Sequence, residues 1–418
     1  MNCWSIGALV AAVALAGCNG SNSGTAFGIS TAPSPKNVLF FLGDGMGMTT
    51  MTAARIYKVG EEGELTMDTL PETAFVKTFS ANAQVTDSAP SMSAYMTGVK
   101  MNNEVISMSA ETSAYDPATL KDYLAGADTA CPASGNGKPV TTLLELAKVA
   151  GMGTGVVTTT RITHATPAAT YAHICHRDGE NTIAAQMVPG GSGYNSALGD
   201  GVDVFMGGGL RHFLPKETTG SSRTDSRDLV AEMKARGYSM AASRSDFDKL
   251  PASGKLLGLF TASHMSYDLD RDSAKEPSLA DMTSRSIDQL KSNSKGFFLM
   301  VEGGRIDHAL HDTNAKRALQ DTIALNDALE ATIQKLKQSD PELKNTLIVI
   351  TADHDHTLVL NGYTKRTGKY IEGKETSVLG LVKNYDQAGF AQDIHGQPYP
   401  IIGFGTGKKR PTQNRMDD

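Results

Sequence analysis

Two residues of metal-binding type, Asp307 and His311, stand four positions apart just after the apolar run Gly-Phe-Phe-Leu-Met. Residues four apart face the same side of a helix, so both side chains could bind one small metal ion. Glu302 precedes them where the apolar run breaks into Gly303-Gly304, a pattern typical of a buried strand that ends at a loop. The alternative is that Asp307 and His311 only cap and solvate an exposed helix start.

Two further apolar runs end in residues of the same kind. Asp44 follows the run Val38–Leu42, and Asp353 and His354 follow the run Thr346–Thr351. The carboxyl ends of parallel strands meet at one edge of an α/β sheet, and ligands bind at that edge. Carboxylates gathered there would repel one another unless a cation lay among them. The sequence therefore predicts a shared metal cluster at this edge.

A candidate nucleophile, Ser88, stands at the start of a helix that we predict to run through Met96. Amides at the helix end and a nearby metal would favour the ionised hydroxyl. The alternative is that Ser88 is a helix cap, just as a single Asp after a strand is often a turn residue. The joint occurrence of these residues is what favours a catalytic site.

The elements that would position these residues alternate along the chain from Lys36 onward. Short apolar or β-branched runs alternate with helical patterns, which is typical of one sheet covered by helices on both faces. We predict a single doubly wound α/β domain with an irregular insertion at about 361–398. Further strands or extended segments are expected at 73–79, 155–160, 202–206 and 256–260, and helices at 141–150, 227–236, 278–291 and 315–336.

Length and charge exclude some classes of protein. With 418 residues and 40% hydrophobic residues, the chain can build one large α/β core or two ordinary domains. Its net charge of -6 argues against a general nucleic-acid binder, so we expect no nucleic-acid partner. A site for an anionic substrate would then need local positive charge from metal ions or from a placed Arg.

The first residues form an apolar segment that is too short to span a bilayer. Its end, Leu15-Ala16-Gly17-Cys18, resembles a bacterial lipoprotein signal, although no Lys or Arg precedes the apolar run. This resemblance implies a signal peptide over 1–17, acylation of Cys18 with a lipid anchor, and a polar tether over 18–35. An ordinary secretory signal cut slightly later is the alternative. Both predict an exported protein, periplasmic or anchored to the outer membrane if the source is bacterial.

Only Cys131 and Cys175 would remain as thiols in the exported domain, because cleavage removes Cys3 and acylation uses Cys18. Two cysteines in an oxidising compartment can form a disulfide. Sequence alone does not place them within bonding distance, so the bonded and the free states both stay open.

Six ordered segments together resemble the alkaline phosphatases, and the resemblance extends from about Lys36 to the end of the chain. It implies a three-layer α/β/α sandwich with a mostly parallel central sheet. It also implies a hydrolase that acts on small phosphate monoesters and forms a homodimer. The segments are Gly43-Asp44-Gly45-Met46-Gly47, Thr86-Asp87-Ser88-Ala89, His164-Ala165-Thr166-Pro167-Ala168, His173–Arg177, Val301–His311 and Thr351-Ala352-Asp353-His354.

The resemblance further implies catalysis through a phosphoserine at a site with two zinc ions and one magnesium ion. Ser88 would be the nucleophile, and the planar fork of Arg177 would bind two phosphate oxygens. The alternative for Arg177 is a surface side chain beside Asp178. The implied metal ligands are Asp44, Asp353 and His354 for one zinc, Asp307 and His311 for the other, and Asp44, Thr166 and Glu302 for magnesium.

Other histidines would support this site without binding metal. His164 stands where some family members carry Asp, near the magnesium, and His308 where some carry Lys, near the phosphate. We expect both to contact and orient the groups that bind metal or phosphate, without binding metal themselves. For His173 and His356 we expect packing or hydrogen bonding.

The sequence departs from the family at its end. The family's second zinc takes another His from a late motif, Glu-Thr-His-Gly-Gly-Glu-Asp, which is not found here. We therefore expect a C-terminally incomplete domain over 36–418 whose second zinc is held weakly by two ligands. His395 is the alternative third ligand. Two other functions stay open, a phosphodiesterase or sulfatase with the same metal-bearing strand ends, and a weakly active or non-catalytic lipoprotein that binds metal or phosphate.

Overall fold

The computed structural model describes residues 35–364, 366, 380–382 and 389–405. The predicted signal peptide 1–17 and the acylation site Cys18 lie outside these ranges, as does nearly all of the tether 18–35. The insertion expected at about 361–398 lies only partly inside them. Among the residues so described, no helix combines the length and the apolar character needed to cross a bilayer.

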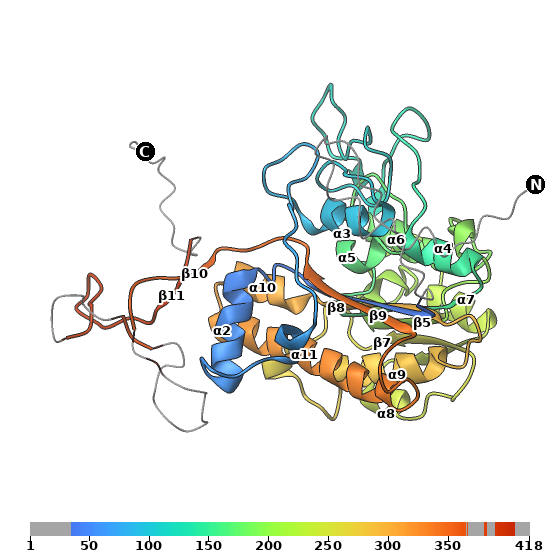
Figure 1. Cartoon of the computed structure of the whole chain (residues 1–418). Coiled ribbons are helices and arrows are strands. Elements are labelled where there is room, and N and C mark those ends of the chain that lie inside the picture. Colours follow the sequence, from blue (N-terminus) through green and yellow to red (C-terminus); the bar gives the residue numbers. More distant parts are fainter. Residues whose placement is uncertain (1–34, 365, 367–379, 383–388, 406–418) are drawn as a thin grey trace, which may run out of the picture.

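A seven-stranded sheet organises the chain, and its strands all run parallel in the order β6-β7-β5-β4-β8-β1-β9. Parallel neighbours need crossover connections, which are mostly helical here. Figure 1 shows helices above and below the sheet, so the predicted three-layer α/β/α fold is confirmed. The strands are β1 (Asn37–Gly43), β4 (Gly153–Arg161), β5 (Val204–Gly208), β6 (Tyr238–Ala241), β7 (Lys255–Leu259), β8 (Phe297–Gly303) and β9 (Thr346–Ala352).

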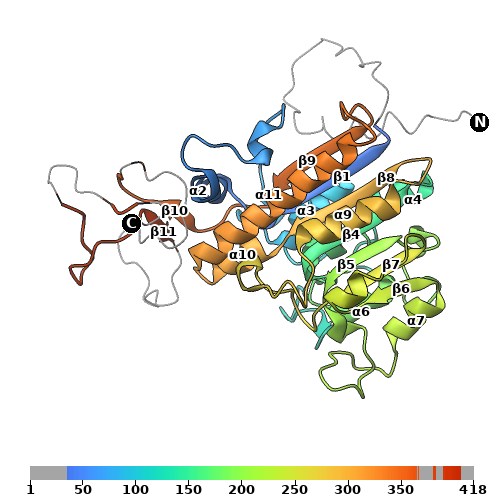
Figure 2. The ribbon, with the colours of Figure 1, turned by 90° about the horizontal axis from the view of Figure 1, so that it is seen from below.

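Alternate side chains of the central strands pack into two cores, one on each face of the sheet. In β1, Leu39 and Phe41 belong to one core, whereas Phe40 and Leu42 belong to the other. A strand buried on both faces is a continuous apolar run, as the sequence showed. The first core is covered by α9 (Leu279–Leu290) and α11 (Ala315–Lys337), which Figure 2 shows in front of the strands, and by α2 (Met48–Val59) to one side of α11. The second core is covered by α3 (Ser88–Thr97), α4 (Leu143–Val149), α5 (Ala165–Ala168), α6 (Glu180–Gln186) and α7 (Leu229–Ala235).

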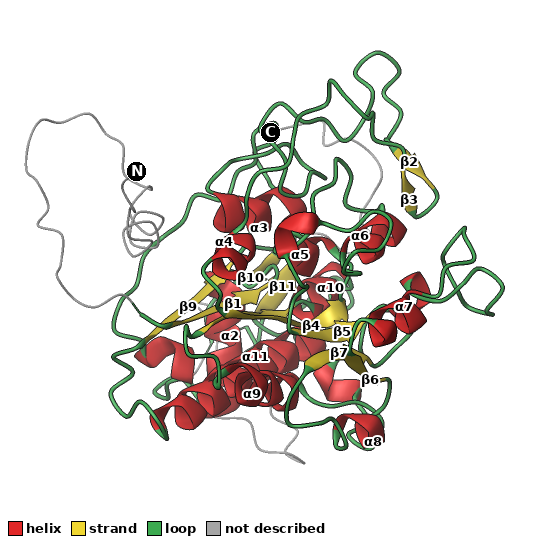
Figure 3. Cartoon of the chain, turned by 90° about the vertical axis from the view of Figure 1, so that its right-hand side faces the viewer, coloured by secondary structure: helices red, strands yellow, loops and turns green. Residues whose placement is uncertain are grey.

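Smaller elements lie at the margins of the three layers. The antiparallel pair β2 (Leu124–Ala125) and β3 (Asp128–Thr129) stands apart from the main sheet in Figure 3. A second antiparallel pair, β10 (Leu358–Leu360) and β11 (Ile402–Phe404), flanks the predicted insertion and projects from the body (Figures 1 and 2). Short helices lie at α8 (Arg244–Phe247), α10 (Arg305–His311), Thr66–Thr69, Ser196–Leu198, Leu210–His212 and Asp268–Asp270.

Most of the expected elements are confirmed within a few residues, with two kinds of exception. The extended segment expected at 73–79 belongs to no strand, and its Phe75 is 84% exposed. Helix α2 was not anticipated, because it buries mainly the small residues Thr50, Ala53 and Ala54 together with Tyr57. Small buried residues give a weak apolar period, so the pattern along the sequence does not reveal this helix.

A disulfide joins Cys131 to Cys175, whose Cα atoms are 5.9 Å apart. The question that the sequence left open is thereby answered in favour of the bonded state. The bridge ties the loop after β3 to the segment that leads into Arg177.

One buried carboxyl of helix α11 gives the fold a testable pH dependence. Burial, and then the charge of Asp268, raise the pKa of Asp321 to about 8. The folded chain therefore holds a proton that the unfolded chain releases near pH 4, so this group's contribution to stability is complete below about pH 4 and is lost as the pH rises to 8. We expect Asp321→Asn to raise Tm relative to the native sequence by an increment that grows from pH 5 to pH 8.

Thermal melts at several pH values measure this increment. Asp327→Asn, on the exposed side of the same helix, is the control and should shift Tm equally at each pH. An Asp321→Asn increment that does not change with pH would contradict the assignment.

Candidate active site

Three carboxylates meet at the carboxyl edge of the sheet. Strands β1, β8 and β9 are adjacent, and their last residues lie opposite one another in the sheet register. Asp44 follows β1, Glu302 is the penultimate residue of β8, and Asp353 follows β9. All three side chains are completely buried, as expected for a cluster at a strand edge rather than for solvated turn residues.

Ser88 is the first residue of helix α3 and points into this cluster. Asp87 caps the helix by accepting a hydrogen bond from the Ala89 N–H at 2.8 Å, so Ser88 is not the capping residue. The Ser88 hydroxyl donates to Asp44 Oδ1 at 3.1 Å and lies 3.4 Å from His354 Nε2. A hydroxyl held between a carboxylate and an imidazole at a helix N-terminus is placed as a nucleophile.

The guanidinium of Arg177 lies beside Ser88's helix and is fixed by a carboxylate that the sequence had not singled out. Its Nη1 donates to Asp87 Oδ1 at 2.8 Å, and its Nη2 lies 3.2 Å from His164 Nε2. The second oxygen of Asp87 accepts from the Glu104 N–H at 2.6 Å. The side chain of Arg177 is 14% exposed, so the alternative of a surface arginine is wrong.

A group of oxygen-rich donors surrounds the second oxygen of Asp44. Asp44, His164 and Glu302 each offer a ligand atom within 4.8 Å of the others. Thr166, at the start of α5, donates to Asp44 Oδ2 at 3.1 Å. Two carboxylates and a hydroxyl are the ligand types that magnesium prefers.

The two residues after β9 are held in different ways. Asp353 Oδ1 accepts from the Gly45 N–H at 3.0 Å. His354 Nδ1 lies 2.9 Å from the backbone oxygen of Asp355, which can only accept a hydrogen bond, so Nδ1 carries the proton. In the neutral ring, Nε2 then carries a lone pair, 3.4 Å from Asp44 Oδ1 and 3.5 Å from Asp353 Oδ2. These three side chains therefore present a carboxylate and imidazole set suited to zinc.

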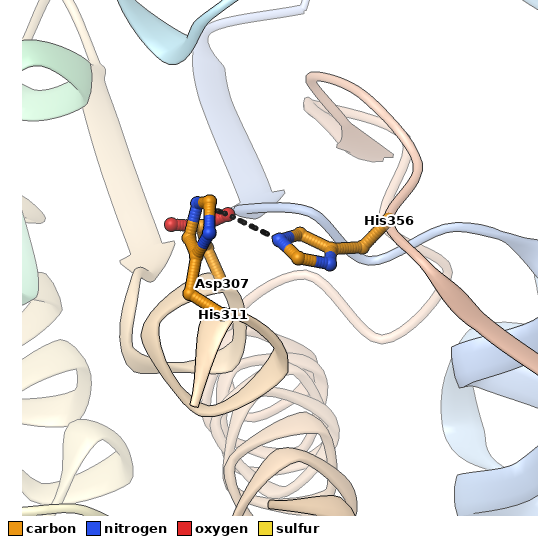
Figure 4. Close-up of side chains that lie close together, drawn as sticks. All are labelled: Asp307, His311 and His356. Atoms are coloured by element: carbon orange, nitrogen blue, oxygen red, sulfur yellow. Dashed lines mark ion pairs between the residues drawn. The ribbon is translucent and has the colours of Figure 1, made fainter. Parts of the chain in front are cut away.

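A further group forms around Asp307 of helix α10. Figure 4 shows Asp307 and His311 side by side on the helix, with His356 pointing at them from the segment after β9. Asp307 Oδ1 lies 3.4 Å from His311 Nε2 and 3.5 Å from His356 Nε2. The three residues form one of the groups whose donor atoms are close enough to hold a metal ion.

The hydrogen bonds of His356 distinguish it from a ligand. Its Nδ1 accepts from the Thr357 N–H at 2.9 Å, so in the neutral ring Nε2 carries the proton. His356 therefore directs an N–H toward Asp307 Oδ1 at 3.5 Å, an electrostatic contact and not a hydrogen bond, and in this tautomer it offers no lone pair to a metal ion. The alternation of His354 and His356 along the segment is the sequence signal that could have indicated two roles at neighbouring sites.

Three histidine rings pack together beside Arg177. The ring of His308 lies 4.2 Å from that of His264 and 5.4 Å from that of His164. His308 Nδ1 faces Arg305 Nη1 at 2.8 Å. Burial lowers the pKa of His308 to about 3 and that of His164 well below its usual value, so both rings are neutral. His264 was not anticipated, because nothing in its local sequence marks it as a neighbour of the other two.

Two other histidines lie apart from the metal-binding groups. His173 Nε2 lies 2.7 Å from Glu145 Oε1, and its Nδ1 lies 2.7 Å from the Ser107 backbone oxygen, which agrees with the expected structural role. His395 is exposed, and it belongs to none of the potential metal-binding groups in the part of the chain that the structure describes.

The electrostatics of the cluster favour bound cations. Burial, and then the charge of Asp44, raise the pKa of Glu302 well above its usual value and that of Asp353 to about 6. Burial raises the pKa of Asp307 to about 6. Although burial opposes it, the charges of Asp353 and Asp44 raise the pKa of His354 to about 11. Positive charge among these side chains would relieve the repulsion between the buried carboxylates.

Unpartnered buried atoms point to the same conclusion. Glu302 Oε1, Asp307 Oδ1 and His164 Nδ1 are buried and have no hydrogen-bond partner among the residues that the structure describes. An unsatisfied buried polar atom costs about 1–3 kcal/mol, and more when the group is charged. Each of these atoms belongs to one of the groups described above, so the donors present fit bound metal ions.

Comparison with known proteins places this geometry in context. A family model for alkaline phosphatase matches residues 35–395. The alkaline phosphatase of Gadus morhua and the membrane-bound alkaline phosphatase of Bombyx mori are each 36% identical to this chain over 89% of it, and the matches cover 77% and 67% of those proteins. The structure of alkaline phosphatase from the Antarctic bacterium TAB5 is similar with a TM-score of 0.63 and 27% identity, covering 79% of this chain and 83% of that chain.

Proposed function

The chain belongs to the alkaline phosphatase family of metal-dependent phosphoric monoester hydrolases, and we propose that it hydrolyses small phosphate monoesters through a covalent phosphoserine at Ser88. The observation that carries the proposal is the position of Ser88 Oγ, 3.1 Å from Asp44 Oδ1 and 3.4 Å from His354 Nε2. Nearby side chains offer buried atoms that could bind metal and that have no hydrogen-bond partner among the described residues.

Substrate binding begins with the phosphate group. The Arg177 fork and the N-terminal amides of α3 supply positive charge and N–H donors for a phosphate dianion. The ion pair with Asp87 and the contact with His164 fix the plane of the guanidinium, whose remaining N–H groups are available for phosphate oxygens. This arrangement positions the phosphorus next to Ser88.

The hydrogen bond from Ser88 to Asp44 directs the hydroxyl proton away from the phosphate. The lone pairs of Oγ are then free to attack the phosphorus in line with the leaving alcohol. The Oγ–P bond forms as the ester P–O bond breaks, and the alcohol takes up a proton. In a second displacement water attacks the phosphorus, the Oγ–P bond breaks, and inorganic phosphate leaves while Ser88 regains its proton.

For the metals we keep the ligand assignment predicted from the sequence, which the short distances between these side chains support. When bound, the metal ions supply positive charge that favours ionised oxygen nucleophiles and neutralises the leaving oxygen. We assign Asp44, Asp353 and His354 to one zinc, Asp307 and His311 to the other, and Asp44, Thr166 and Glu302 to magnesium.

A direct test is to trap the intermediate. We expect a reaction with p-nitrophenyl phosphate, quenched in acid during turnover, to yield a peptide that carries one phosphate on Ser88. Mass spectrometry with fragmentation locates the phosphate. Ser91, one turn further along α3, is the internal control. Phosphate on Ser91, or turnover without any phosphorylated peptide, would refute the proposed intermediate.

We also propose that the protein is exported and lipid-anchored through Cys18. The disulfide between Cys131 and Cys175 supports an oxidising compartment. Cells that express the chain and are fed radiolabelled palmitate should label it, and Cys18→Ser should abolish the label. Cys3→Ser is the control, because cleavage would remove that residue, so equal labelling of the Cys18→Ser chain would disprove the anchor.

A further inference from the structure

One oxygen of the buried Glu302 carboxylate is engaged and the other is not. Oε2 accepts from the hydroxyl of Thr158 and lies 3.2 Å from that of Thr160, while Oε1 has no hydrogen-bond partner within the described part of the chain. Oε1 is thus the oxygen left available to the group that Glu302 forms with Asp44 and His164. Which oxygen of Glu302 can reach a cation therefore depends on what binds the other one.

Strand β4 brings both hydroxyls to Glu302. Thr158 and Thr160 are two residues apart, so their side chains lie on the same face of the strand, and both are completely buried. β4 is the parallel neighbour of β8, and Thr158 lies opposite Glu302 in the register. The hydroxyls are therefore fixed by the sheet itself and not by a mobile loop.

Gly304 lies next to the other oxygen of the carboxylate, Oε1. A Cβ atom at Gly304 would lie 2.5 Å from Glu302 Oε1 and 2.3 Å from the methyl group of Thr160. These distances are shorter than real Cβ contacts, so only glycine leaves room for Oε1 here. The threonine hydroxyls of β4 therefore contact one oxygen of the carboxylate, and Gly304 has no side chain that would displace the other.

The two threonines differ in what their protons can do. Thr158 Oγ1 accepts from the Thr160 N–H at 2.8 Å, and its own proton has two acceptors within reach, Glu302 Oε2 and Thr160 Oγ1. The single proton of Thr160 has alternative acceptors, because its hydroxyl lies 3.0 Å from the Arg161 backbone oxygen and 2.8 Å from Thr158 Oγ1. Thr158 therefore has fewer competing acceptors than Thr160, whose proton can also go to the Arg161 backbone oxygen, so we take Thr158 as the main donor to Glu302.

We propose that Thr158 is a positioning residue for the magnesium site. Its hydroxyl anchors Oε2 of Glu302 and so leaves Oε1 to bind the cation. The inference rests on the proposed assignment of Glu302 to magnesium. Partners that orient a metal ligand typically change metal affinity by about 10- to 100-fold when they are removed. An unanchored carboxylate would rotate and lose the defined oxygen that a magnesium ion with strict octahedral geometry requires.

The test compares isosteric variants in the full, zinc-loaded chain. Val replaces the hydroxyl of Thr158 with a methyl and keeps the other methyl, which lies near Gly207. Binding of Mn²⁺, a paramagnetic substitute for magnesium, is titrated by electron paramagnetic resonance, and Mg²⁺ affinity follows from competition. We expect Thr158→Val to weaken binding by about tenfold or more, Thr158→Ser to restore it, and the matched control Thr160→Val to change it by less than about threefold.

Thermal melts and zinc content show that each variant is folded and loaded. Unchanged affinity in Thr158→Val, failure of Thr158→Ser to restore binding, or an equal loss in Thr160→Val would overturn the proposal. Glu302→Gln distinguishes a wrong role for Thr158 from a wrong assignment of magnesium to Glu302. If Glu302→Gln binds Mn²⁺ as the native sequence does, the cation is not at Glu302, and the magnesium assignment itself falls.

Discussion

Ser88→Ala is expected to lower kcat for p-nitrophenyl phosphate by about 10³- to 10⁶-fold, the range found when a covalent nucleophile is removed. The expectation follows from the position of Ser88 Oγ, which contacts both Asp44 and His354. No other hydroxyl of helix α3 makes both contacts. Without this oxygen the phosphoryl group has no covalent acceptor. Water would have to attack directly, with only the remaining charge stabilisation of the site to assist it.

Steady-state kinetics of the zinc- and magnesium-loaded chains measure this effect. Thr97→Ala is the matched control, because Thr97 lies at the far end of the same helix and its hydroxyl bonds only to backbone. A folded, metal-loaded Ser88→Ala chain with native kcat would mean that Ser88 is not the nucleophile. A similar fall in both variants would indicate damage to the helix and not to the chemistry.

Asp44→Asn should have the second largest effect, a fall in kcat/KM of about 10³-fold or more, as for the loss of a central electrostatic group. One oxygen of Asp44 accepts from Ser88 and the other from Thr166, both at 3.1 Å, and His354 Nε2 lies 3.4 Å away. The amide keeps the size of the side chain but removes its charge and one acceptor. The nucleophile and the groups assigned to zinc and magnesium would all lose their shared partner.

The same substitution should stabilise the metal-free protein. Asp44 is one of the charges that raise the pKa of Glu302 and Asp353, so its removal relieves repulsion in the empty cluster. We therefore expect lower metal content by elemental analysis together with a higher Tm after chelation. Asp68→Asn, a half-buried carboxylate paired with Arg55 away from the site, is the control. A less stable metal-free Asp44→Asn chain, or one with native metal content, would contradict the role given to Asp44.

The sheet and its functional edge were predictable because both depend on local patterns. The apolar runs of β1, β8 and β9 are continuous, so their ends are visible in the sequence. Once the strands are parallel, the residues after them must meet at one edge. This geometry alone brings Asp44, Glu302 and Asp353 together, and the sequence showed it without any knowledge of the packing.

What the sequence did not reveal depends on contacts between distant segments. The pairing of Arg177 with Asp87 and the packing of His264 on His308 join residues whose local patterns carry no mark of each other. The run Thr158-Thr159-Thr160 is typical of any β-strand, because threonine favours strands. Only the register of β4 against β8 shows that one of these threonines lies opposite Glu302 and can donate to it.

The place of β1 in the sheet has a consequence for how the chain reaches its native state. β1 is the first strand to be synthesised, yet its two neighbours are β8 and β9, the last strands of the main sheet. Pairings so distant in sequence close slowly, because a long loop must be ordered before any contact forms. A nascent chain that stops short of β9 lacks Asp353 and His354 and leaves one edge of β1 without its partner strand. Catalytic competence should therefore appear abruptly and late during biogenesis, and we expect no active intermediate among chains that end before β9.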